Sequence, residues 1–546
     1  MKQADKASSK STENSITSLD RFFEAKPRLI PWISFGLFIL LSICLFEPKV
    51  SIGGDDTEYI NRAYNLLHQG IFPTFQGPFY PMALAVIMLV TGVNVIAFKI
   101  FSVLCLAGHN WFMYKMLRNY VSPSALFAVM VLLCSSSVFL LYGCNTYTES
   151  FYLFIQGYFL YYFDKHFIRG GNPFDLKKDY LPVIIAGLLL FLLSITRNIG
   201  LVGLATVILY FITQKQWKQV VFILGSFTLF FFTLHIMKVT IWNVGDQQIS
   251  GQGSTLLLKN SFRPDAGNED FAGFIDRLIG NSVNYLGFHF LNIFGISLAK
   301  WPNLKVLTTI FIYIGLIAAL LVYFRKSRFW YFITLFILAS AGITFLALQV
   351  YWNQERLVLI VVPLLLALSI HGLHKLFTGR LGKFAFLFFA LVGILMVANL
   401  FRSLEKVPKQ LTVLSKYMAG DKFYGFADDW INYLTMAGWV DEHLPDSAFV
   451  ACRKPGMAFI YSNGRNFHGI YRLPSQDPAE LYKILRDAKV THVIMANLRA
   501  NPDDPNSAVI TTERRYLEAI NQAFPGKLKL IHQVGENYPA YLYELN

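Results

Sequence analysis

The sequence predicts a polytopic α-helical membrane protein with a small α/β domain at the C-terminal end of the chain. Of the 546 residues, 54% are hydrophobic and only 15% are charged, whereas a soluble protein carries charge on roughly a quarter of its residues. Apolar stretches recur from residue 30 to about residue 400, many of them close to the roughly 20 residues that a membrane-spanning helix needs. After about residue 420 the composition becomes that of a soluble domain. These observations indicate an integral protein of the cell or inner membrane.

About eleven spans follow from the apolar segments. The candidates are 30–47, 95–114, 123–142, 150–163, 180–195, 198–213, 219–240, 305–324, 329–348, 357–374 and 383–401. Residues 79–90 are apolar but cover only about half a bilayer, so they predict an interfacial or re-entrant helix. As a single helix, residues 181–213 would be about 50 Å long, too long for one span. We therefore divide them into two short spans joined at 194–198.

The positions of lysine and arginine predict which connections face the cytoplasm. One alternating set of connections is basic and holds Arg21, Lys26, Arg28, Lys115, Arg118, Lys165, Arg169, Lys177, Lys178, Lys215, Lys218, Arg325, Lys326, Arg328, Lys375, Arg380 and Lys383. Because short cytoplasmic loops carry an excess of Lys and Arg, this set is predicted to be cytoplasmic. The N-terminus then lies inside. With an odd number of spans, the first long loop (48–94) and the C-terminal domain lie outside.

The chain is predicted to have three parts. Residues 1–28 form a disordered cytoplasmic tail, residues 29–402 the transmembrane domain and residues 420–546 the extracytoplasmic domain. In the last part, helical patterns at 429–443, 478–488 and 513–523 alternate with strand patterns at 448–453, 490–495, 528–533 and 540–544, which is typical of a small α/β domain. The segment 242–300 is too long and polar for a turn and shows no clear regular structure, as functional or disordered loops do.

The net charge of +14 does not indicate a nucleic-acid partner. The basic residues are scattered in short clusters between apolar segments, which favours cytoplasmic loops and anionic lipid headgroups instead. The five cysteines form no CxxC pair, and four of them lie in or beside apolar segments. The sequence therefore predicts neither a disulfide framework nor a zinc site.

The start of the first outer loop is the strongest candidate for an active site. Asp55, Asp56 and Glu58 lie within four residues, directly after the first span, where charge is costly unless it is useful. A segment rich in proline and aromatic residues (71–81) follows and would wall off a groove. The alternative interpretation is structural, because Asp55 as the N-cap of a helix, with Glu58 three residues on, makes a variant of the capping box.

Five short motifs share the predicted outer face. They are the acidic pair with Tyr59, residues 77–81 (Gly-Pro-Phe-Tyr-Pro), Thr148-Glu149 at the outer end of the third span, residues 196–200 around Arg197, and residues 355–363 around Arg356. In order and sidedness they resemble the GT-C superfamily of polyprenyl-phosphate-sugar-dependent glycosyltransferases, especially the branch with protein mannosyltransferases and lipid A aminoarabinose transferases. Asn198 and Leu357 depart from the proline and tyrosine that this family has at those places.

The resemblance implies a reaction and a role for each residue. The first Asp of the pair, Asp55, would take the proton of the acceptor hydroxyl with inversion at the sugar, and Asp56 would orient Asp55 or the acceptor. A phosphate leaving group departs without protonation and needs fixed cations, for which the arginine fork is well suited. The substrate-binding residues would be Tyr59, Glu149, Arg197 and Arg356. The alternatives are a solvated helix end for Glu149 and snorkelling for the arginines, and snorkelling is also expected for Lys99.

The implied partners are a polyprenyl-phosphate sugar donor, a glycan, lipid or protein acceptor, and membrane lipids, with no nucleic acid. No obligate cofactor or metal is implied, although some branches of the family hold a divalent cation between outer-loop carboxylates, so a cation at Glu149 stays open. Two other functions stay open as well. A flippase or transporter of lipid-linked glycans predicts mid-span charges and repeats. A polymerase or ligase of surface polysaccharide predicts catalytic residues in a late outer loop such as 242–300.

Overall fold

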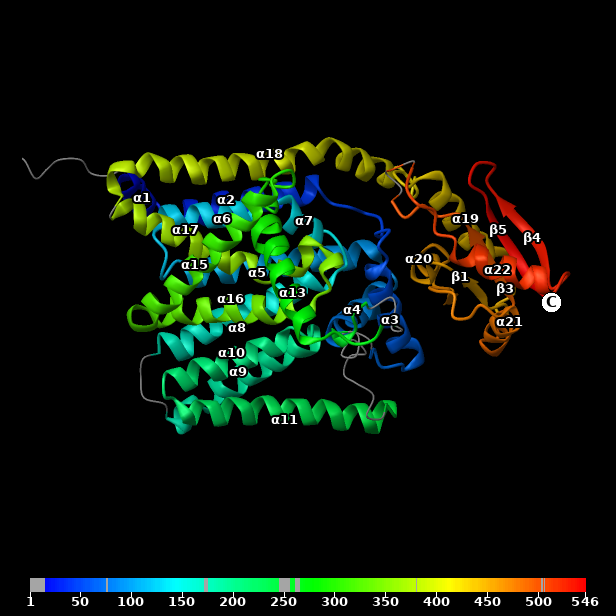
Figure 1. Cartoon of the computed structure of the whole chain (residues 1–546), viewed down its shortest axis with the longest axis horizontal. Coiled ribbons are helices and arrows are strands. Elements are labelled where there is room, and N and C mark those ends of the chain that lie inside the picture. Colours follow the sequence, from blue (N-terminus) through cyan, green and yellow to red (C-terminus); the bar gives the residue numbers. More distant parts are fainter. Residues whose placement is uncertain are drawn as a thin grey trace, which may run out of the picture. The chain divides into compact units, whose positions relative to one another are not determined.

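The computed structural model describes residues 15–74, 77–170, 175–244, 256–260, 266–379, 381–501, 504 and 506–546. The chain divides into two compact units (Figure 1). The first unit contains Met1–Phe46, Gly70–Ala83 and Phe98–Leu411, and the second contains Glu47–Gln69, Leu84–Ala97 and Thr412–Asn546. The acidic pair thus belongs to the same unit as the C-terminal residues.

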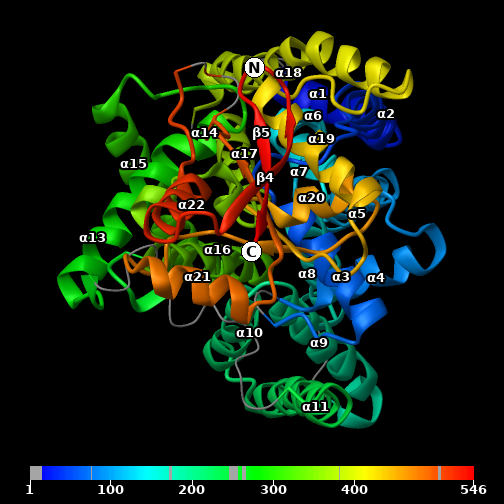
Figure 2. The same ribbon diagram turned by 90° about the vertical axis from the view of Figure 1, so that its right-hand side faces the viewer.

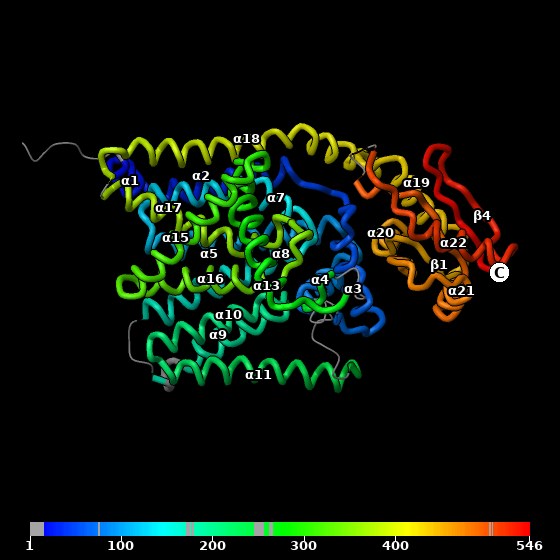
Figure 3. The backbone as a smooth tube through the Cα atoms, in the orientation of Figure 1, coloured from blue at the N-terminus to red at the C-terminus, as the bar shows by residue number. Residues whose placement is uncertain are grey.

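The first unit is built of helices. They are α1 (Ser15–Ala25), α2 (Leu29–Cys44), α5 (Val95–Leu117), α6 (Pro123–Ser135), α7 (Ser137–Gly143), α8 (Thr148–Phe163), α9 (Leu176–Thr196), α10 (Gly200–Thr213), α11 (Trp217–Trp242), α13 (Phe271–Ser282), α14 (Phe290–Asn292), α15 (Pro302–Lys326), α16 (Arg328–Ala347), α17 (Val362–Thr378) and α18 (Ala385–Met418). Helix α4 (Phe79–Thr91) and the ends of α5 and α18 continue into the second unit. In Figure 3, α9, α10 and α11 run side by side, and the three helices pack on one another.

The apolar helices confirm the predicted class of an α-helical membrane protein. Among the described residues, five helices are long and apolar enough to cross a membrane, or up to seven if each of two bent pairs is one span. The bent pairs are α1 with α2 (87°) and α6 with α7 (52°). Only 17% of the apolar window of α11 and 11% of that of α15 is buried inside the protein, as expected for helices that face lipid. The count of about eleven spans and their orientation stay predictions.

The prediction of a disordered tail over 1–28 is wrong for residues 15–25, which form α1. Ile16 and Phe23 are buried, and the Asp20 carboxylate accepts the backbone N–H of Ser124 (2.9 Å) at the start of α6 and lies 2.8 Å from His374 Nε2. The polar composition concealed an amphipathic helix that packs on α6 and α17. Residues 1–14 lie outside the described residues.

The prediction that 242–300 lacks regular structure is also wrong, since α13, a π-helical segment η4 (Val283–His289) and α14 lie within it. The buried residues of α13 are polar (Arg277, Asn281 and Ser282), whereas Phe271 and Ile279 are 82% and 59% exposed. An amphipathic helix with its apolar face outward is typical of a membrane interface. Its polar buried face explains why the hydrophobic pattern did not reveal a packed helix. Residues 245–255 and 261–265 lie outside the described residues.

The second unit contains a five-stranded mixed sheet with helices on both faces. The strands are β1 (Val450–Cys452), β2 (Phe467–Gly469), β3 (His492–Ala496), β4 (Leu528–Val534) and β5 (Ala540–Leu545), in the order β2-β1-β3-β5-β4. Strands β2, β1 and β3 are parallel to one another, and β5 is antiparallel to both β3 and β4. The predicted small α/β fold is therefore confirmed.

The helices of this unit are α3 (Asp55–Gln69), α19 (Asp428–His443), α20 (Pro455–Tyr461), α21 (Pro478–Asp487) and α22 (Thr512–Ala523). Alternate strand residues face opposite cores: Val450 and Ile494 pack against α19 and α20, whereas Ala451 packs against α21 and α22. Figure 2 shows the two helix pairs on opposite sides of β4 and β5. The sequence did not predict α20 and β2, because seven and three residues are too short for a periodic pattern.

Glu513, in the first turn of α22, gives this unit a pH-dependent stability. Its side chain is buried, and its Oε2 atom has no hydrogen-bond partner among the described residues. Burial raises the pKa of the Glu513 carboxyl from 4.5 to about 7, although its own backbone N–H and Arg453 lower that pKa in part. Between pH 4.5 and 7 the unfolded chain releases a proton that the folded chain keeps. The free energy of unfolding therefore falls as the pH rises through this window, by about 3 kcal/mol in all, and is constant above it.

We expect the variant Glu513→Gln to lose this pH dependence. At pH 8 the second unit of the variant should be more stable than that of the wild type by about 1–3 kcal/mol, whereas near pH 4.5 the two should be equal. Hydrogen exchange of α22 and β1 in the full-length protein, corrected for intrinsic exchange rates, measures both. Parallel stability profiles for the two proteins would show that Glu513 titrates normally.

Candidate functional site

The acidic pair opens helix α3 in the second unit. Gly54 adopts a left-handed conformation (φ +83°), and its carbonyl accepts the N–H of Glu58 (3.1 Å). The Asp56 carboxylate is fully buried and accepts the N–H (2.7 Å) and hydroxyl (2.9 Å) of Ser51 and the N–H of Thr57 (2.9 Å). Asp56 therefore ties the helix to the turn before it. Because α3 begins at Asp55, the alternative prediction of Asp55 as the N-cap is wrong.

Asp55 and Tyr59 differ in exposure. Asp55 is half-buried, one residue from the fixed Asp56, and Tyr59 is only 6% exposed. A carboxylate at the first turn of a helix is stabilised by the N-terminal end of the helix dipole. The turn thus presents Asp55 on a fixed backbone, while Asp56 maintains that backbone.

Two residues of the C-terminal part contact this turn, and the sequence analysis missed both. Lys454 Nζ donates hydrogen bonds to the carbonyl oxygens of Ile52 (3.1 Å) and Gly53 (3.3 Å). The Tyr471 hydroxyl donates to Glu58 Oε1 (3.0 Å). Lys454 and Ile52 are 402 residues apart in the chain, so no local pattern could have revealed the contact. The sequence offered one indication only for Lys454, which follows the predicted strand at 448–453. Tyr471 follows β2, which the sequence did not predict.

The other candidate residues meet in the first unit, at the start of α8. Glu149 is only 2% exposed. Its Oε1 atom lies 2.7 Å from Arg197 Nη1 and 4.0 Å from Arg356 Nε, and Arg197 Nη1 also donates to the Thr148 hydroxyl (3.4 Å). The Arg356 guanidinium lies 5.6 Å from the centroid of the Tyr147 ring, within range of a cation–π interaction. We call Tyr147, Thr148, Glu149, Arg197 and Arg356 the arginine cluster.

The arginine cluster holds more positive than negative charge. Two guanidinium groups face one carboxylate, and their side chains are 23% and 25% exposed. Solvent therefore reaches both arginines, and the cluster can accept an anion such as a phosphate through charge-assisted hydrogen bonds. The prediction that Lys99 snorkels to the membrane surface is wrong. Its side chain is fully buried and donates a hydrogen bond to Asn145 Oδ1 (3.0 Å), four residues before Glu149.

Each arginine lies in a connection between helices. Arg197 lies between α9 and α10, where the chain breaks at 197–199, close to the break predicted at 194–198. A side chain at Gly77 would collide with the carbonyl oxygens of Ile195 and Thr196, so glycine permits the segment before α4 to approach this break. Arg356 lies in the short 3-10 helix η6 (Glu355–Val358), just before α17.

The segment 281–292 braces the connection that carries Arg356. The Asn281 amide donates to the carbonyl oxygens of Phe345 and Leu348 (both 2.8 Å), which end α16. His289 Nε2 lies 2.8 Å from Asn353 Oδ1, and the Asn292 amide donates to Glu355 (3.4 Å). One face of this segment therefore supports residues 345–355. The long loop that showed no chemistry in the sequence therefore contacts Glu355, the residue before Arg356.

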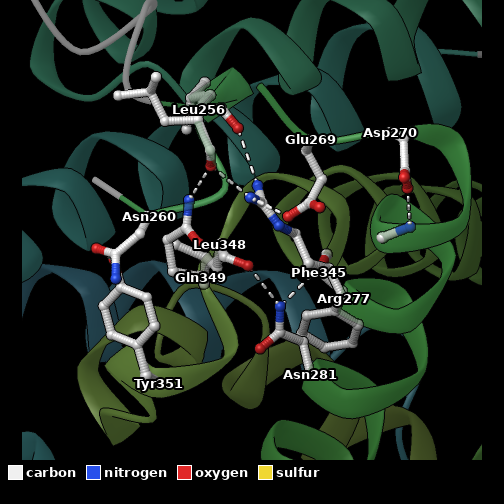
Figure 4. Close-up of polar contacts among 12 residues, drawn as sticks. Leu256, Asn260, Glu269, Asp270, Arg277, Asn281, Phe345, Leu348, Gln349 and Tyr351 are labelled. Carbon is white, nitrogen blue, oxygen red and sulfur yellow. Dashed lines mark hydrogen bonds and ion pairs between the residues drawn. The ribbon is translucent and has the colours of Figure 1, made fainter. Parts of the chain in front are cut away.

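Arg277, earlier in α13, joins that helix to residues 256–269 (Figure 4). The guanidinium of Arg277 is buried and donates to the carbonyl oxygens of Leu256 (2.9 Å) and Leu258 (2.6 Å) and to Glu269 Oε2 (2.6 Å). The Gln349 amide donates to the same Leu258 carbonyl (2.7 Å). A buried arginine that satisfies two carbonyls and a carboxylate is a structural group. It links α13 to residues 256–258, and the Leu258 carbonyl also receives the Gln349 amide, which follows α16.

The surroundings of Glu149 disfavour a cation there. A metal ion bound to Glu149 would lie next to two guanidinium groups, so three cationic centres would be close together. Among the described residues, no group of three or more His, Cys, Asp or Glu side chains is arranged to hold a metal ion. The net positive charge of the arginine cluster therefore favours an anion over a divalent cation.

No protein-family model and no curated protein matches the chain, but solved structures do. The oligosaccharyltransferase AglB of Archaeoglobus fulgidus, with an inhibitory peptide and a dolichol-phosphate, matches at 12% identity and a TM-score of 0.50, over 85% of this chain and 69% of its own. An oligosaccharyltransferase of the same organism, with zinc and sulfate, matches at 11% and 0.56, over 91% and 79%. ArnT from Cupriavidus metallidurans, bound to undecaprenyl phosphate, matches at 10% and 0.51, over 95% and 98%.

These structural neighbours are GT-C glycosyltransferases. At identities of 10–12% the matches establish a shared fold and leave the chemistry open. The resemblance that the sequence motifs indicate is therefore confirmed at the level of the fold. Together with the apolar helices, the matches identify an integral membrane protein.

Proposed function

We propose that this protein is an integral membrane glycosyltransferase that moves a sugar from a polyprenyl-phosphate donor to a hydroxyl group of an acceptor on the outer face of the membrane. The observation that carries the proposal is the arginine cluster, in which Glu149 holds Arg197 and Arg356 at one place on a GT-C fold. Two neighbours support a lipid-phosphate donor, because their structures contain dolichol-phosphate and undecaprenyl phosphate.

The arginine cluster would bind the phosphate of the donor. A polyprenyl phosphate leaves as an anion, so its departure requires fixed positive charge and no general acid. Two guanidinium groups can each donate paired N–H groups to phosphate oxygens. Glu149 and Tyr147 would keep both groups oriented before the donor arrives, which reduces the entropy that binding must otherwise cost.

Asp55 would act as the general base. As the acceptor hydroxyl forms its bond to the anomeric carbon, its proton passes to the Asp55 carboxylate while the bond to the phosphate oxygen breaks. Attack opposite the phosphate inverts the anomeric centre. Asp56 would hold the turn that presents Asp55, through its bonds to Ser51 and Thr57, and Tyr59 would contribute to substrate binding.

The proposal includes about eleven spans, with the N-terminus inside and residues 420–546 outside, in the same unit as the acidic pair. The acceptor would be a glycan, a lipid or a protein, and the transferred unit a hexose or a pentose. A divalent cation, such as the zinc in one neighbour, would not be obligatory for transfer.

The test is transfer of radiolabelled sugar from a set of polyprenyl-phosphate sugars by the full-length protein in proteoliposomes. We expect label from one donor class to reach a hydroxyl acceptor, and addition of a chelator to leave the rate unchanged. Transport of intact donor across the membrane without transfer would favour a flippase. Elongation of a polysaccharide chain en bloc would favour a polymerase or ligase.

A further inference from the structure

The C-terminal sheet contributes side chains to the acidic turn (residues 51–58). Strands β1 and β2 are parallel neighbours, so their carboxyl ends lie at the same edge of the sheet. Lys454 comes two residues after β1 and Tyr471 two residues after β2. Both side chains reach the turn, Lys454 through the carbonyls of Ile52 and Gly53 and Tyr471 through Glu58. The carboxyl edge of parallel strands is where open α/β sheets place ligands, and here it receives the start of α3.

Lys454 is itself rigidly held. The backbone N–H of Lys454 donates to the Tyr433 hydroxyl (3.2 Å), and that hydroxyl donates to the Lys454 carbonyl (2.9 Å). Tyr433 is fully buried in α19. Next to Lys454, a side chain at Gly456 would collide with Thr57, so α20 packs closely on α3. The ammonium group therefore projects from a fixed backbone and is itself bound to the carbonyls of Ile52 and Gly53.

The charges around Lys454 belong to both parts of the unit. Burial and the adjacent Arg453 lower the pKa of the Lys454 ammonium, and the carboxylates of Asp55, Asp56 and Glu58 raise it in part. A half-buried lysine that satisfies two backbone carbonyls beside three carboxylates costs solvation that a surface lysine would not. A lysine that only helped α20 to pack on α3 would not need to lie beside three carboxylates, because apolar contacts could hold the two helices together.

We propose that Lys454 is a positioning residue of the active site, which fixes the acidic turn so that Asp55 is held ready for the acceptor. The C-terminal sheet is then a part of the catalytic apparatus. Only the claim that this positioning serves catalysis by Asp55 rests on the proposed function. That Lys454 holds the turn is independent of the reaction that Asp55 performs.

The test compares three variants of the full-length protein. Lys454→Met removes the charge and the N–H donors at nearly the same length, Lys454→Arg keeps both, and Lys483→Met is a control at an exposed lysine of α21. We expect Lys454→Met to raise hydrogen exchange of residues 51–58, with α19 and β3 unchanged, and to lower kcat about 10- to 100-fold at an unchanged KM for the donor. Lys454→Arg should restore most of both, and Lys483→Met should match the wild type.

The two readouts separate the two claims. Unchanged exchange of residues 51–58 in Lys454→Met would overturn the positioning role, whatever the protein catalyses. Raised exchange with unchanged kcat would show that the turn is held but that catalysis does not depend on it, which also overturns the proposal. If Lys454→Met disrupts α19 as well, the arginine variant provides the test. Should Lys454→Arg, which keeps the charge and the N–H donors, lose as much activity as Lys454→Met, positioning by hydrogen bonds is contradicted. A wild type without transferase activity would end the proposed function but leave the exchange result interpretable.

Discussion

Replacing Asp55 by asparagine should reduce the rate of sugar transfer about 10³-fold, with little change in donor binding. An amide has nearly the same shape as the carboxylate but cannot accept the proton of the acceptor hydroxyl, and general-base catalysis contributes roughly 10²–10⁴ to a rate. The turn should keep its structure, because Asp56 provides the hydrogen bonds to Ser51 and Thr57. Single-turnover transfer by Asp55→Asn and wild type, at saturating donor, measures the difference.

The chain provides a matched control for this substitution. Helix α19 also opens on two aspartates, of which Asp428 is exposed and Asp429 is buried against Arg499. The pair repeats the arrangement of Asp55 and Asp56 at a helix without a proposed reaction. Asp428→Asn should therefore transfer sugar at the wild-type rate. Equal rates for Asp55→Asn and Asp428→Asn would show that Asp55 has only a structural role.

Removing either arginine of the cluster should lower kcat/KM for the donor about 10²-fold. Each guanidinium is proposed to stabilise the charge that develops on the leaving phosphate, and loss of one such fixed donor costs roughly 10²–10³ in rate. Because both arginines share Glu149, the double variant should lose less than the product of the two single losses. Kinetics of Arg197→Ala, Arg356→Ala and the double variant give the coupling.

Two further variants distinguish phosphate binding from simple charge. Arg197→Lys keeps the charge but loses the planar fork, so its activity should lie between that of the wild type and Arg197→Ala. Arg325→Ala removes an exposed arginine at the end of α15 and should leave kcat/KM unchanged. If binding of polyprenyl phosphate, followed by native mass spectrometry, is as tight in the double variant as in the wild type, the arginine cluster is not the phosphate site.

The sequence predicts the helices best where they are long and uniformly apolar, whether they face lipid, as α11 and α15 do, or are mostly buried, as α16 is. The segments that form α5, α11, α15 and α16 follow directly from hydropathy. A break between α9 and α10 follows from helix length, although it lies at 197–199 and not at 194–198. Helix α13 escaped because its buried residues, Arg277 and Asn281, are polar. Helix α1 escaped because its few apolar residues stand among charged ones. In both cases composition was a poor guide to which side of the helix is buried.

The sequence predicted the individual residues of the candidate site but not which of them contact one another. Glu149, Arg197 and Arg356 each stand at the predicted outer end of an apolar segment, which marks them individually. That one carboxylate holds both guanidinium groups depends on the packing of α8 on α9 and on the position of η6. The sequence instead suggested substrate binding or a cation for Glu149. The contact of Lys454 with the acidic turn joins residues 402 positions apart, and no local pattern encodes it.

The most direct test of the central claim follows the fate of the donor. Sealed proteoliposomes with the wild-type protein receive a donor labelled separately in its sugar and in its polyprenyl chain, together with a hydroxyl acceptor. A glycosyltransferase transfers the sugar label to the acceptor and releases one polyprenyl phosphate for each sugar transferred, and this is the result we predict. Intact donor that reaches the other leaflet, with both labels together and no polyprenyl phosphate released, would contradict the account and identify a transporter.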